Sequence, residues 1–385
     1  MKTDSVPLTV GLLVFISSLI SLRFTLPVAI IEILAGVVAG NFGLKSENWM
    51  LYLGSFGGIL LTFLAGTEID VKLMRERFKE SFLIGVFSFL APFILVFIFT
   101  FYIAHWNFSA SLIAGIALST TSLAVVYSVL VETNLSSTEI GKLIMAATFI
   151  TDIGTALGLS LLFFKPTFYT AVFIVSSIIV IIFAVKFSPV VFGHPKIKNK
   201  VIEPEIKYLF IFLLALMYFA NLGDSHAVLP AFVLGLLMSK YFTETSESRV
   251  VRNRLRTVAY AMITPIFFLL GGLRVSAPLI FSALGIFATL FVLKIAAKFL
   301  GVYFLAKRYI PNGTIYTTLL MSTGLTFGTI ASVFGFNSGL INQSQYSVLV
   351  GVVIASAVIP TFVAQRWFMP VHSEDILDLD NGHDN

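Results

Sequence analysis

Long runs of apolar residues, separated by short segments that hold the charged and turn-forming residues, make up most of the chain. A helix needs roughly 20 apolar residues to cross the hydrocarbon core of a bilayer, and it satisfies its own backbone hydrogen bonds there. The runs are continuous and do not alternate with polar residues, which predicts transmembrane helices and argues against an outer-membrane barrel. The thirteen predicted spans are residues 6–22, 26–43, 49–67, 82–104, 109–130, 138–164, 168–186, 208–222, 226–240, 257–273, 278–306, 314–336 and 345–368.

The composition agrees with this class. Of the 385 residues, 57% are hydrophobic and 12% are charged, whereas soluble domains carry about a quarter charged residues. A soluble enzyme and a nucleic-acid-binding protein are therefore excluded, and the lack of cysteine excludes disulfides and cysteine-ligated metals. No glycine-rich phosphate loop and no nucleophile–base pair within the spans are found, which argues against an ATP-driven pump and a membrane enzyme. The sequence predicts an all-α polytopic membrane protein with no cofactor.

Basic residues lie mostly on one side of the predicted spans. Because Lys and Arg in short loops stay cytoplasmic, an outside N-terminus places nineteen of the 25 basic residues on the cytoplasmic side and four outside. The asymmetry predicts an outside N-terminus and a cytoplasmic C-terminus. Residues 1–369 then form the transmembrane domain, with basic loops at 187–207 and 241–256, and residues 370–385 form an acidic tail that we expect to be disordered.

Four ionisable residues lie well inside predicted spans, namely Glu32, Asp152, Lys294 and Lys298. A charge in the bilayer core costs at least about 2.5 kcal/mol, so these residues are candidates for function. Asp152 lies near the middle of its span, among Thr148, Thr151, Gly154 and Thr155. A carboxylate in this setting can hold either a cation or a proton, and the alternative is a buried aspartate that pairs with a helix-end amide.

Two segments have the composition of interrupted membrane helices. Four consecutive hydroxyl residues, Ser119 to Ser122, lie in the middle of one span, and residues 321–335 are equally rich in Ser, Thr and Gly. Discontinuous helices of transporters expose backbone groups and helix ends at their binding sites, and the alternative is a packing face of small residues. The two segments lie seven spans apart, which fits an inverted repeat. That arrangement would bring the helices of Asp152 and of the two lysines together.

The roles of the remaining charged residues stay open at this point. Lys294 and Lys298 share one helix face; either could pair with Asp152, and either could instead extend to the membrane surface. Glu32 lies beside Gly36 and Gly40, which form a tight-packing signature, so structural and functional roles are equally possible. We expect Asp224 and His226 to form a turn and not a metal site, because no third ligand lies near.

Several segments resemble the monovalent cation:proton antiporter-2 family. They are LPVAIIEILAGVVAGNFG, GGILLTFLAGTEID, the stretch from ALSTTSLAVVYSV to TFITDIGTALGLSLLF, and PIFFLLGGLRV, and the similarity extends over about residues 26–366. The resemblance implies inverted repeats with two crossing broken helices, a homodimer in the membrane lipid, and elevator-type movement of a core domain against a dimerisation domain. It also implies that Asp152 binds the ion, that Thr121 and Ser122 belong to the broken helix, and that Lys298 is the core lysine.

Thr151 stands where relatives carry Asp, Asn or Gln, so only one carboxylate is present and electroneutral exchange is the simpler expectation. Potassium-efflux relatives carry a nucleotide-binding regulatory domain after the last span, and we expect none here. The sequence thus predicts an antiporter of a prokaryotic cell membrane that exchanges cytoplasmic Na⁺ or Li⁺ for external H⁺. The alternatives are a K⁺/H⁺ antiporter, a cation channel and a sodium-coupled organic-anion symporter.

Overall fold

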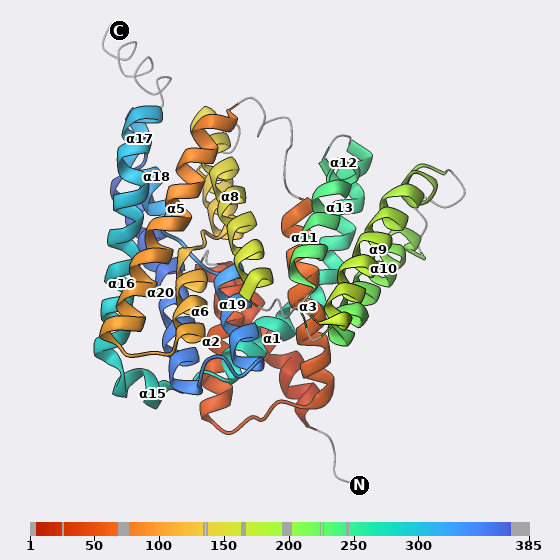
Figure 1. The fold of residues 1–385 in the computed structure, drawn as a ribbon, viewed down its shortest axis with the longest axis horizontal. Coiled ribbons are helices and arrows are strands. Elements are labelled where there is room, and N and C mark those ends of the chain that lie inside the picture. Colours follow the sequence, from red (N-terminus) through yellow and green to blue (C-terminus); the bar gives the residue numbers. More distant parts are fainter. Residues whose placement is uncertain are drawn as a thin grey trace, which may run out of the picture.

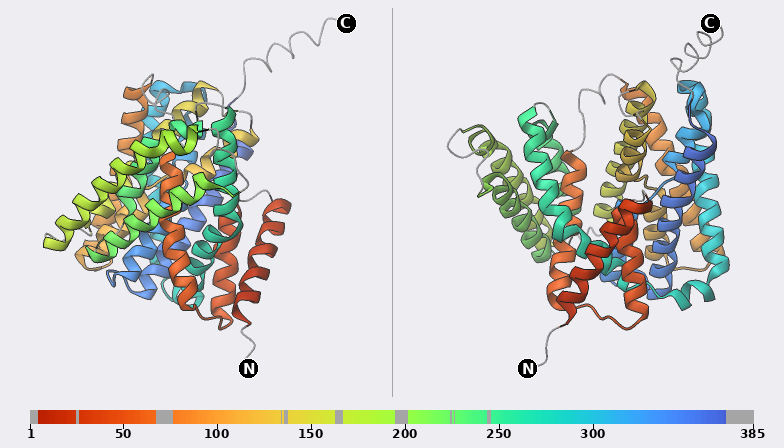
Figure 2. Two further views of the ribbon diagram at one scale, coloured as in Figure 1. Left: turned by 90° about the vertical axis from the view of Figure 1, so that its right-hand side faces the viewer. Right: turned by 180° about the vertical axis from the view of Figure 1, so that it is seen from behind.

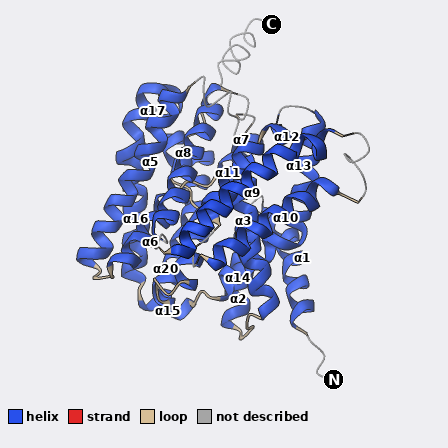
Figure 3. Ribbon diagram, turned by 45° about the vertical axis from the view of Figure 1, so that its right-hand side comes forward, coloured by secondary structure: helices blue, strands red, loops and turns tan. Residues whose placement is uncertain are grey.

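The computed structural model describes residues 5–24, 27–67, 77–133, 135, 138–162, 167–194, 202–223, 225, 227–243 and 246–370. All regular structure in these residues is helical (Figure 3). Asp224, His226 and the predicted tail beyond residue 370 lie outside the described residues, so the expectations for them stay predictions.

The helices of the first half of the chain follow the predicted spans. They are α1 (Val6–Phe24), α2 (Val28–Asn41), α3 (Asn48–Thr67), α5 (Phe78–Ile98) with the π-helical turn η1 (Phe99–Ile103), α6 (Phe108–Ser119), α7 (Leu123–Glu132), α8 (Glu139–Leu162) and α9 (Phe168–Gly193). The second half contains α10 (Pro204–Leu222), α11 (Val228–Met238), α12 (Lys240–Thr243), α13 (Ser246–Val258), η2 (Ala259–Ile263), α14 (Thr264–Leu273), α15 (Ala277–Ser282), α16 (Leu284–Lys298), η3 (Phe299–Tyr303), α17 (Phe304–Tyr309), η4 (Pro311–Gly313), α18 (Thr314–Met321), α19 (Thr326–Asn337) and α20 (Gln343–Trp367).

Ten helical segments of the described chain are long and apolar enough to cross a membrane, and α2, α6 and α11 are shorter apolar helices. Each of the thirteen predicted spans coincides with helix in the structure, so the predicted all-α membrane fold is confirmed. The predicted spans 109–130 and 314–336 each contain two helices with a break between them. These two breaks lie at the hydroxyl-rich segments that the sequence singled out.

The expected basic loop at 241–256 is wrong in part, because residues 246–258 form helix α13, which continues through η2 into α14. Val251, Leu255 and Ala259 recur at helical spacing and are buried, and the basic residues between them concealed this period. Arg254 ties α13 to α10 through ion pairs with Glu203 (3.1 Å) and Glu205 (3.6 Å).

The helices form two groups that stand side by side in Figures 1 and 2. The crossing group consists of α5 to α8 and α16 to α20, whose buried apolar residues form one cluster together with residues of α2 and α14 and a few of α3 and α11. The flanking group consists of α3 and α9 to α13, with a second apolar cluster of its own. The molecule therefore has two packed bodies, and the two breaks lie in the first of them.

Glycines allow α2 and α14 to pack almost backbone to backbone. A Cβ at Gly36 would lie 2.2 Å from the carbonyl oxygen of Leu269, and one at Gly272 would lie 2.0 Å from the carbonyl oxygen of Ile33. Any larger residue at these positions would have to push the helices apart. The tight-packing signature of Gly36 and Gly40 is thus confirmed, since a Cβ at Gly40 would also meet the backbone of α14.

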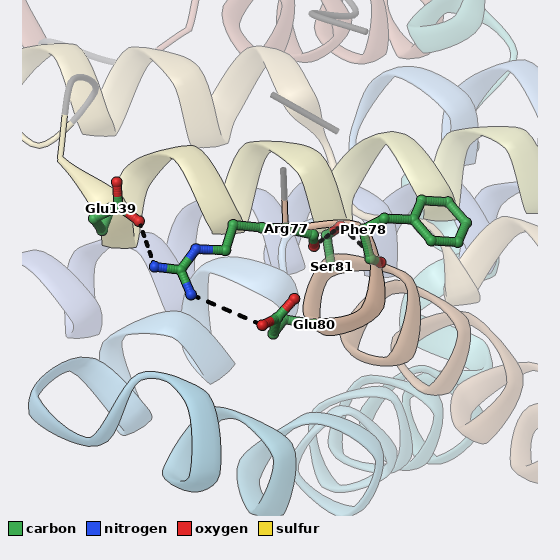
Figure 4. Close-up of polar contacts among 5 residues, drawn as sticks. All are labelled: Arg77, Phe78, Glu80, Ser81 and Glu139. Atoms are coloured by element: carbon green, nitrogen blue, oxygen red, sulfur yellow. Dashed lines mark hydrogen bonds and ion pairs between the residues drawn. The ribbon is translucent and has the colours of Figure 1, made fainter. Parts of the chain in front are cut away.

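Ion pairs join the start of α8 to the start of α5 at one end of the crossing group (Figure 4). Arg77 lies 3.1 Å from Glu139 of α8 and 3.8 Å from Glu80 of its own helix. The three side chains line a cavity of about 210 Å³ together with residues of α17 and η4. Because Arg77 and Glu139 are largely exposed, each pair contributes at most about 1 kcal/mol.

Candidate functional site

The two helix breaks cross and are hydrogen bonded to each other. In the first break, Thr120 is extended (φ −65°, ψ 155°), and the chain becomes helical again at Leu123. The backbone N–H of Ser122 donates to the carbonyl oxygen of Thr323 in the second break (3.2 Å), and the hydroxyl of Thr121 donates to the carbonyl oxygen of Met321 (2.8 Å). Backbone groups that lack a helical hydrogen bond in one break thus find partners in the other. Non-helical backbone can lie within a bilayer only when it is satisfied in this way.

Each break brings the C-terminal end of one helix beside the N-terminal end of another. The first places the C-terminal end of α6 beside the N-terminal end of α7, and the second does the same with α18 and α19. The hydroxyl of Ser122 accepts a hydrogen bond from the N–H of Val125 (3.4 Å) and so caps the start of α7. Helix N-terminal ends carry partial positive charge and C-terminal ends partial negative charge, so the crossing can accommodate charges of both signs.

The ammonium group of Lys298 is fully buried and lies in the first break. Its Nζ donates hydrogen bonds to the carbonyl oxygen of Ser119 (2.6 Å), the hydroxyl of Ser88 (2.8 Å) and the hydroxyl of Thr121 (3.0 Å). An ammonium has three donor hydrogens, and these three acceptors match them. Ser119 ends α6, so Lys298 places its positive charge at the negative end of that helix.

Thr151 holds α8 against the first break. Its hydroxyl donates to the carbonyl oxygen of Thr148 (2.7 Å) and accepts from the backbone N–H of Thr121 (3.2 Å). Asp152 follows Thr151 directly and is 1% exposed, and it lies close enough to Lys298 for the two charges to interact. The structure therefore gathers Asp152, Thr151, Thr121 and Lys298 in one cluster, with Ser122 in the same break.

Lys294 lies against the second break. It is fully buried, and its Nζ donates to the hydroxyl of Ser356 on α20 (2.9 Å). A Cβ on Gly324 would lie 2.3 Å from this Nζ, so the ammonium packs directly against the glycine backbone. The possibility that either lysine extends to the membrane surface is excluded, because both side chains are wholly buried.

Glu32 lies on α2 and is 2% exposed. Gly36 is one turn further along the same helix, on the face that packs against α14, so Glu32 shares that face. Glu32 is therefore a buried residue on the same face of α2 as Gly36, and it takes no part in the hydrogen bonds described above between the two breaks.

The sequence alone did not single out Ser88, Ser356 or Gly324, although each lies against a buried lysine. Ser88 and Ser356 are polar residues within long apolar helices. Polar side chains in such helices commonly bond to neighbouring helices, and this was the signal available. Their lysine partners could not be inferred, because Ser88 and Lys298 lie 210 residues apart in the chain.

The breaks offer oxygen atoms of several kinds to a small cation. Among the described residues, no three or more His, Cys, Asp or Glu side chains form a metal-binding group. Asp152 supplies a carboxylate, Thr121, Ser122 and Thr151 supply hydroxyls, and the non-helical backbone supplies carbonyl groups. Hard cations prefer such oxygen ligands, so the arrangement suits a hard cation better than a transition metal.

Comparisons with known proteins agree with this fold. The profile of the family described as "Sodium/hydrogen exchanger, transmembrane" matches residues 11–369. The "Probable Na(+)/H(+) antiporter 3" of Methanocaldococcus jannaschii is 27% identical over 93% of this chain and 94% of its own length. The "Na(+)/H(+) antiporter" of Enterococcus hirae is 26% identical over 93% of this chain and 96% of its own length.

A solved structure shows the same fold at lower sequence identity. The sodium proton antiporter MjNhaP1 of Methanocaldococcus jannaschii superposes with a TM-score of 0.69 at 14% identity, covering 94% of this chain and 98% of that one. At this identity the likeness concerns the fold, while the profile match covers most of the sequence. The chain thus belongs to the sodium/hydrogen exchanger family of membrane proteins, as the resemblance of its segments to a cation:proton antiporter family led us to expect.

Proposed function

We propose that the protein is a secondary antiporter that exchanges cytoplasmic Na⁺ or Li⁺ for external H⁺ by alternating access. The observation that carries this proposal is the cluster in which Asp152, buried in α8, lies with Lys298 at two crossed helix breaks. Buried charges in a membrane mark ion pathways, and broken helices supply the ligands. The names of the relatives from M. jannaschii and E. hirae support Na⁺ and H⁺ as the exchanged ions.

In this proposal Asp152 binds the cation and the proton alternately. The hydroxyls of Thr151, Thr121 and Ser122 and nearby backbone carbonyls complete the oxygen shell of the cation. Thr121 already accepts a hydrogen bond from Lys298 (3.0 Å), so its oxygen is turned toward a positive charge. When no cation is bound, the ammonium of Lys298 interacts with Asp152 and Thr121. An entering cation replaces it in these interactions, so the two positive charges compete for Asp152.

The stoichiometry follows from the number of acids at the cluster. Thr151 precedes Asp152 and supplies a hydroxyl but no second carboxylate. A single carboxylate that holds either one Na⁺ or one H⁺ supports one-for-one, electroneutral exchange. Alternating access arises when the crossing group moves against the flanking group; most buried apolar residues of each group belong to a separate cluster, which supports this movement.

We assign residues 1–369 to a transmembrane antiporter domain, with residues 370–385 as a cytoplasmic tail. The basic loops support an outside N-terminus and a cytoplasmic C-terminus in a prokaryotic cell membrane. We place a homodimer contact at α1, whose residues Leu8, Phe15 and Leu22 are more than half exposed.

The test is ion exchange in proteoliposomes that carry an imposed pH gradient, acidic inside, and a lumenal pH dye. Na⁺ and Li⁺ are added with valinomycin and equal K⁺ on both sides, and K⁺ is tested separately without ionophore. We expect the lumen to become more alkaline with Na⁺ and Li⁺ but not with K⁺. Valinomycin with equal K⁺ holds the membrane potential at zero, and the rate of alkalinisation should be the same without valinomycin. No response to any of the three cations across pH would overturn the proposal.

A K⁺/H⁺ antiporter is the second candidate. It is favoured by one relative, the "Na(+)/H(+)-K(+) antiporter GerN" of Bacillus cereus, which is 23% identical over 88% of this chain and 89% of its own length. A response to K⁺ of the same size as the response to Na⁺ in the same vesicles would establish this alternative.

A further inference from the structure

A cavity of about 360 Å³ lies away from the helix breaks, between α8, α9 and α11. Its wall is formed by the end of α8, the first half of α9 and the start of α11. In Figure 1 this is the region where the crossing group meets the flanking group. The volume is within the range of about 300–1,000 Å³ that is usual for small-molecule sites, and far above the roughly 30 Å³ that one water occupies.

The wall of this cavity is mainly apolar and opens toward the surface that a membrane covers. Leu161 and Ile178, which line it, are 75% and 52% exposed, and Leu157 and Ile174 on the same wall are also exposed. In a bilayer these side chains contact acyl chains. A lipid can therefore reach the cavity sideways from the membrane without passing through water.

Two buried hydroxyls in the wall set this cavity apart from a plain apolar gap. Ser177 of α9 is 4% exposed, and the Oγ atoms of Ser177 and of Ser160 on α8 have no hydrogen-bond partner in the described structure. The adjacent Ser176 behaves as serine usually does in a membrane helix, because its hydroxyl donates to the carbonyl oxygen of Val172 (2.6 Å). A buried hydroxyl without a partner is unfavourable. Both Oγ atoms are themselves buried, so each hydroxyl reaches an acceptor oxygen in the cavity only after its side chain rotates about the Cα–Cβ bond.

We propose that the cavity binds the acyl-ester portion of a membrane phospholipid. One acyl chain lies along the apolar wall, and an ester carbonyl oxygen, which has two lone pairs, accepts hydrogen bonds from Ser160 and Ser177. The cavity lies where α8 ends and α9 and α11 begin, and ends of membrane helices lie close to the interface that holds the ester groups. The bound lipid bridges the crossing group and the flanking group.

The test is lipid binding to the full-length protein in detergent, measured by native mass spectrometry during titration with a diacyl phosphatidylglycerol. We expect one molecule of this lipid to bind to each wild-type chain more tightly than any further molecules of it. Ser177→Leu, which fills the cavity, should weaken that binding roughly tenfold, while the matched control Ser176→Ala should leave it unchanged. An equal effect of both substitutions, or no effect of Ser177→Leu, would overturn the proposal.

Two further measurements keep the proposal testable if Ser177→Leu does not fold, and they show whether the ester carbonyl groups of the lipid are what the hydroxyls bind. The milder double variant Ser160→Ala/Ser177→Ala should weaken binding of the diacyl lipid by about as much as replacing that lipid with its ether-linked analogue, which lacks the carbonyl groups. In the double variant the two lipids should bind alike. A wild-type protein that binds the ether lipid as tightly as the ester lipid would refute the role of the hydroxyls. Binding is measured without an ion gradient, so its outcome is independent of the exchange proposal.

Discussion

The Nζ atom of Lys298 donates a 2.6 Å hydrogen bond to the carbonyl oxygen of Ser119, the last residue of α6. Carbonyl groups in the last turn of a helix have no partner within the helix, and together they carry partial negative charge. In a bilayer, water cannot satisfy them. The lysine therefore makes the first break possible as well as bringing a positive charge close to Asp152.

Asp152→Asn should abolish cation-dependent proton movement in proteoliposomes. Asparagine has nearly the same shape but can neither bind a proton nor attract a cation by charge, so both halves of the exchange are lost. The carboxylate also interacts favourably with the charge of the buried Lys298, so its loss should lower the stability of the folded protein as well. Size-exclusion chromatography and thermal unfolding check that the variant folds; retained pH-dependent Na⁺ uptake would contradict the assignment.

Lys298→Ala should alter the pH dependence and the apparent Na⁺ affinity of exchange. It removes the ammonium that competes with the cation and leaves the carbonyl group of Ser119 buried without that donor, which costs about 1–3 kcal/mol of folding free energy. Lys298→Arg keeps the charge and serves as the comparison. If Lys298→Ala exchanges like the wild type at every pH while Lys294→Ala does not, the coupling role belongs to Lys294.

The spans and the burial of Asp152 within one of them could be predicted from the sequence, because both depend on local composition. Continuous apolar runs can only be membrane helices, and a carboxylate in the middle of one is conspicuous. The hydroxyl run at Ser119–Ser122 likewise marked the first break. Helix α13 was missed because its apolar positions are diluted by arginines, although Leu255 and Val251 are buried.

The different partners of the two lysines could not be predicted from composition and spacing. Lys294 and Lys298 lie one turn apart on α16 and have the same chemistry, so the sequence only places them on one face. The partners separate them. Lys298 bonds to Ser88 and to the first break, whereas Lys294 bonds to Ser356 and packs against Gly324. Ser88 and Ser356 lie on other helices, far from the lysines in the chain, so only the folded structure shows these contacts.

Thr151→Val should lower the apparent cation affinity and destabilise the protein by about 1–3 kcal/mol, because the buried N–H of Thr121 loses its acceptor. Thr151→Ser keeps the oxygen and should retain most of the activity. The measurements are exchange rate against Na⁺ concentration and the thermal unfolding midpoint of each variant. Equal behaviour of the valine and serine variants would show that the hydroxyl does not position the first break.

Gly324→Ala should impair exchange because a Cβ there would lie 2.3 Å from the Nζ of Lys294. The ammonium cannot withdraw easily, since it is fully buried and bonded to Ser356. The clash should therefore displace the second break or push Lys294 from its place. We expect a loss of stability of about 1–3 kcal/mol, the range for overpacking a buried site, together with a slower exchange rate.

A double-mutant cycle isolates this contact from the general cost of changing a glycine. Lys294→Met removes the ammonium, so Gly324→Ala should cost much less stability in that background than in the wild type, with a coupling energy of about 0.5–3 kcal/mol. Gly328→Ala, in which the Cβ would meet Ala117 and Val353 and not a lysine, is the matched control and should show no coupling to Lys294. Additive effects of Gly324→Ala and Lys294→Met on the unfolding midpoint would mean that the lysine does not hold the second break through this glycine.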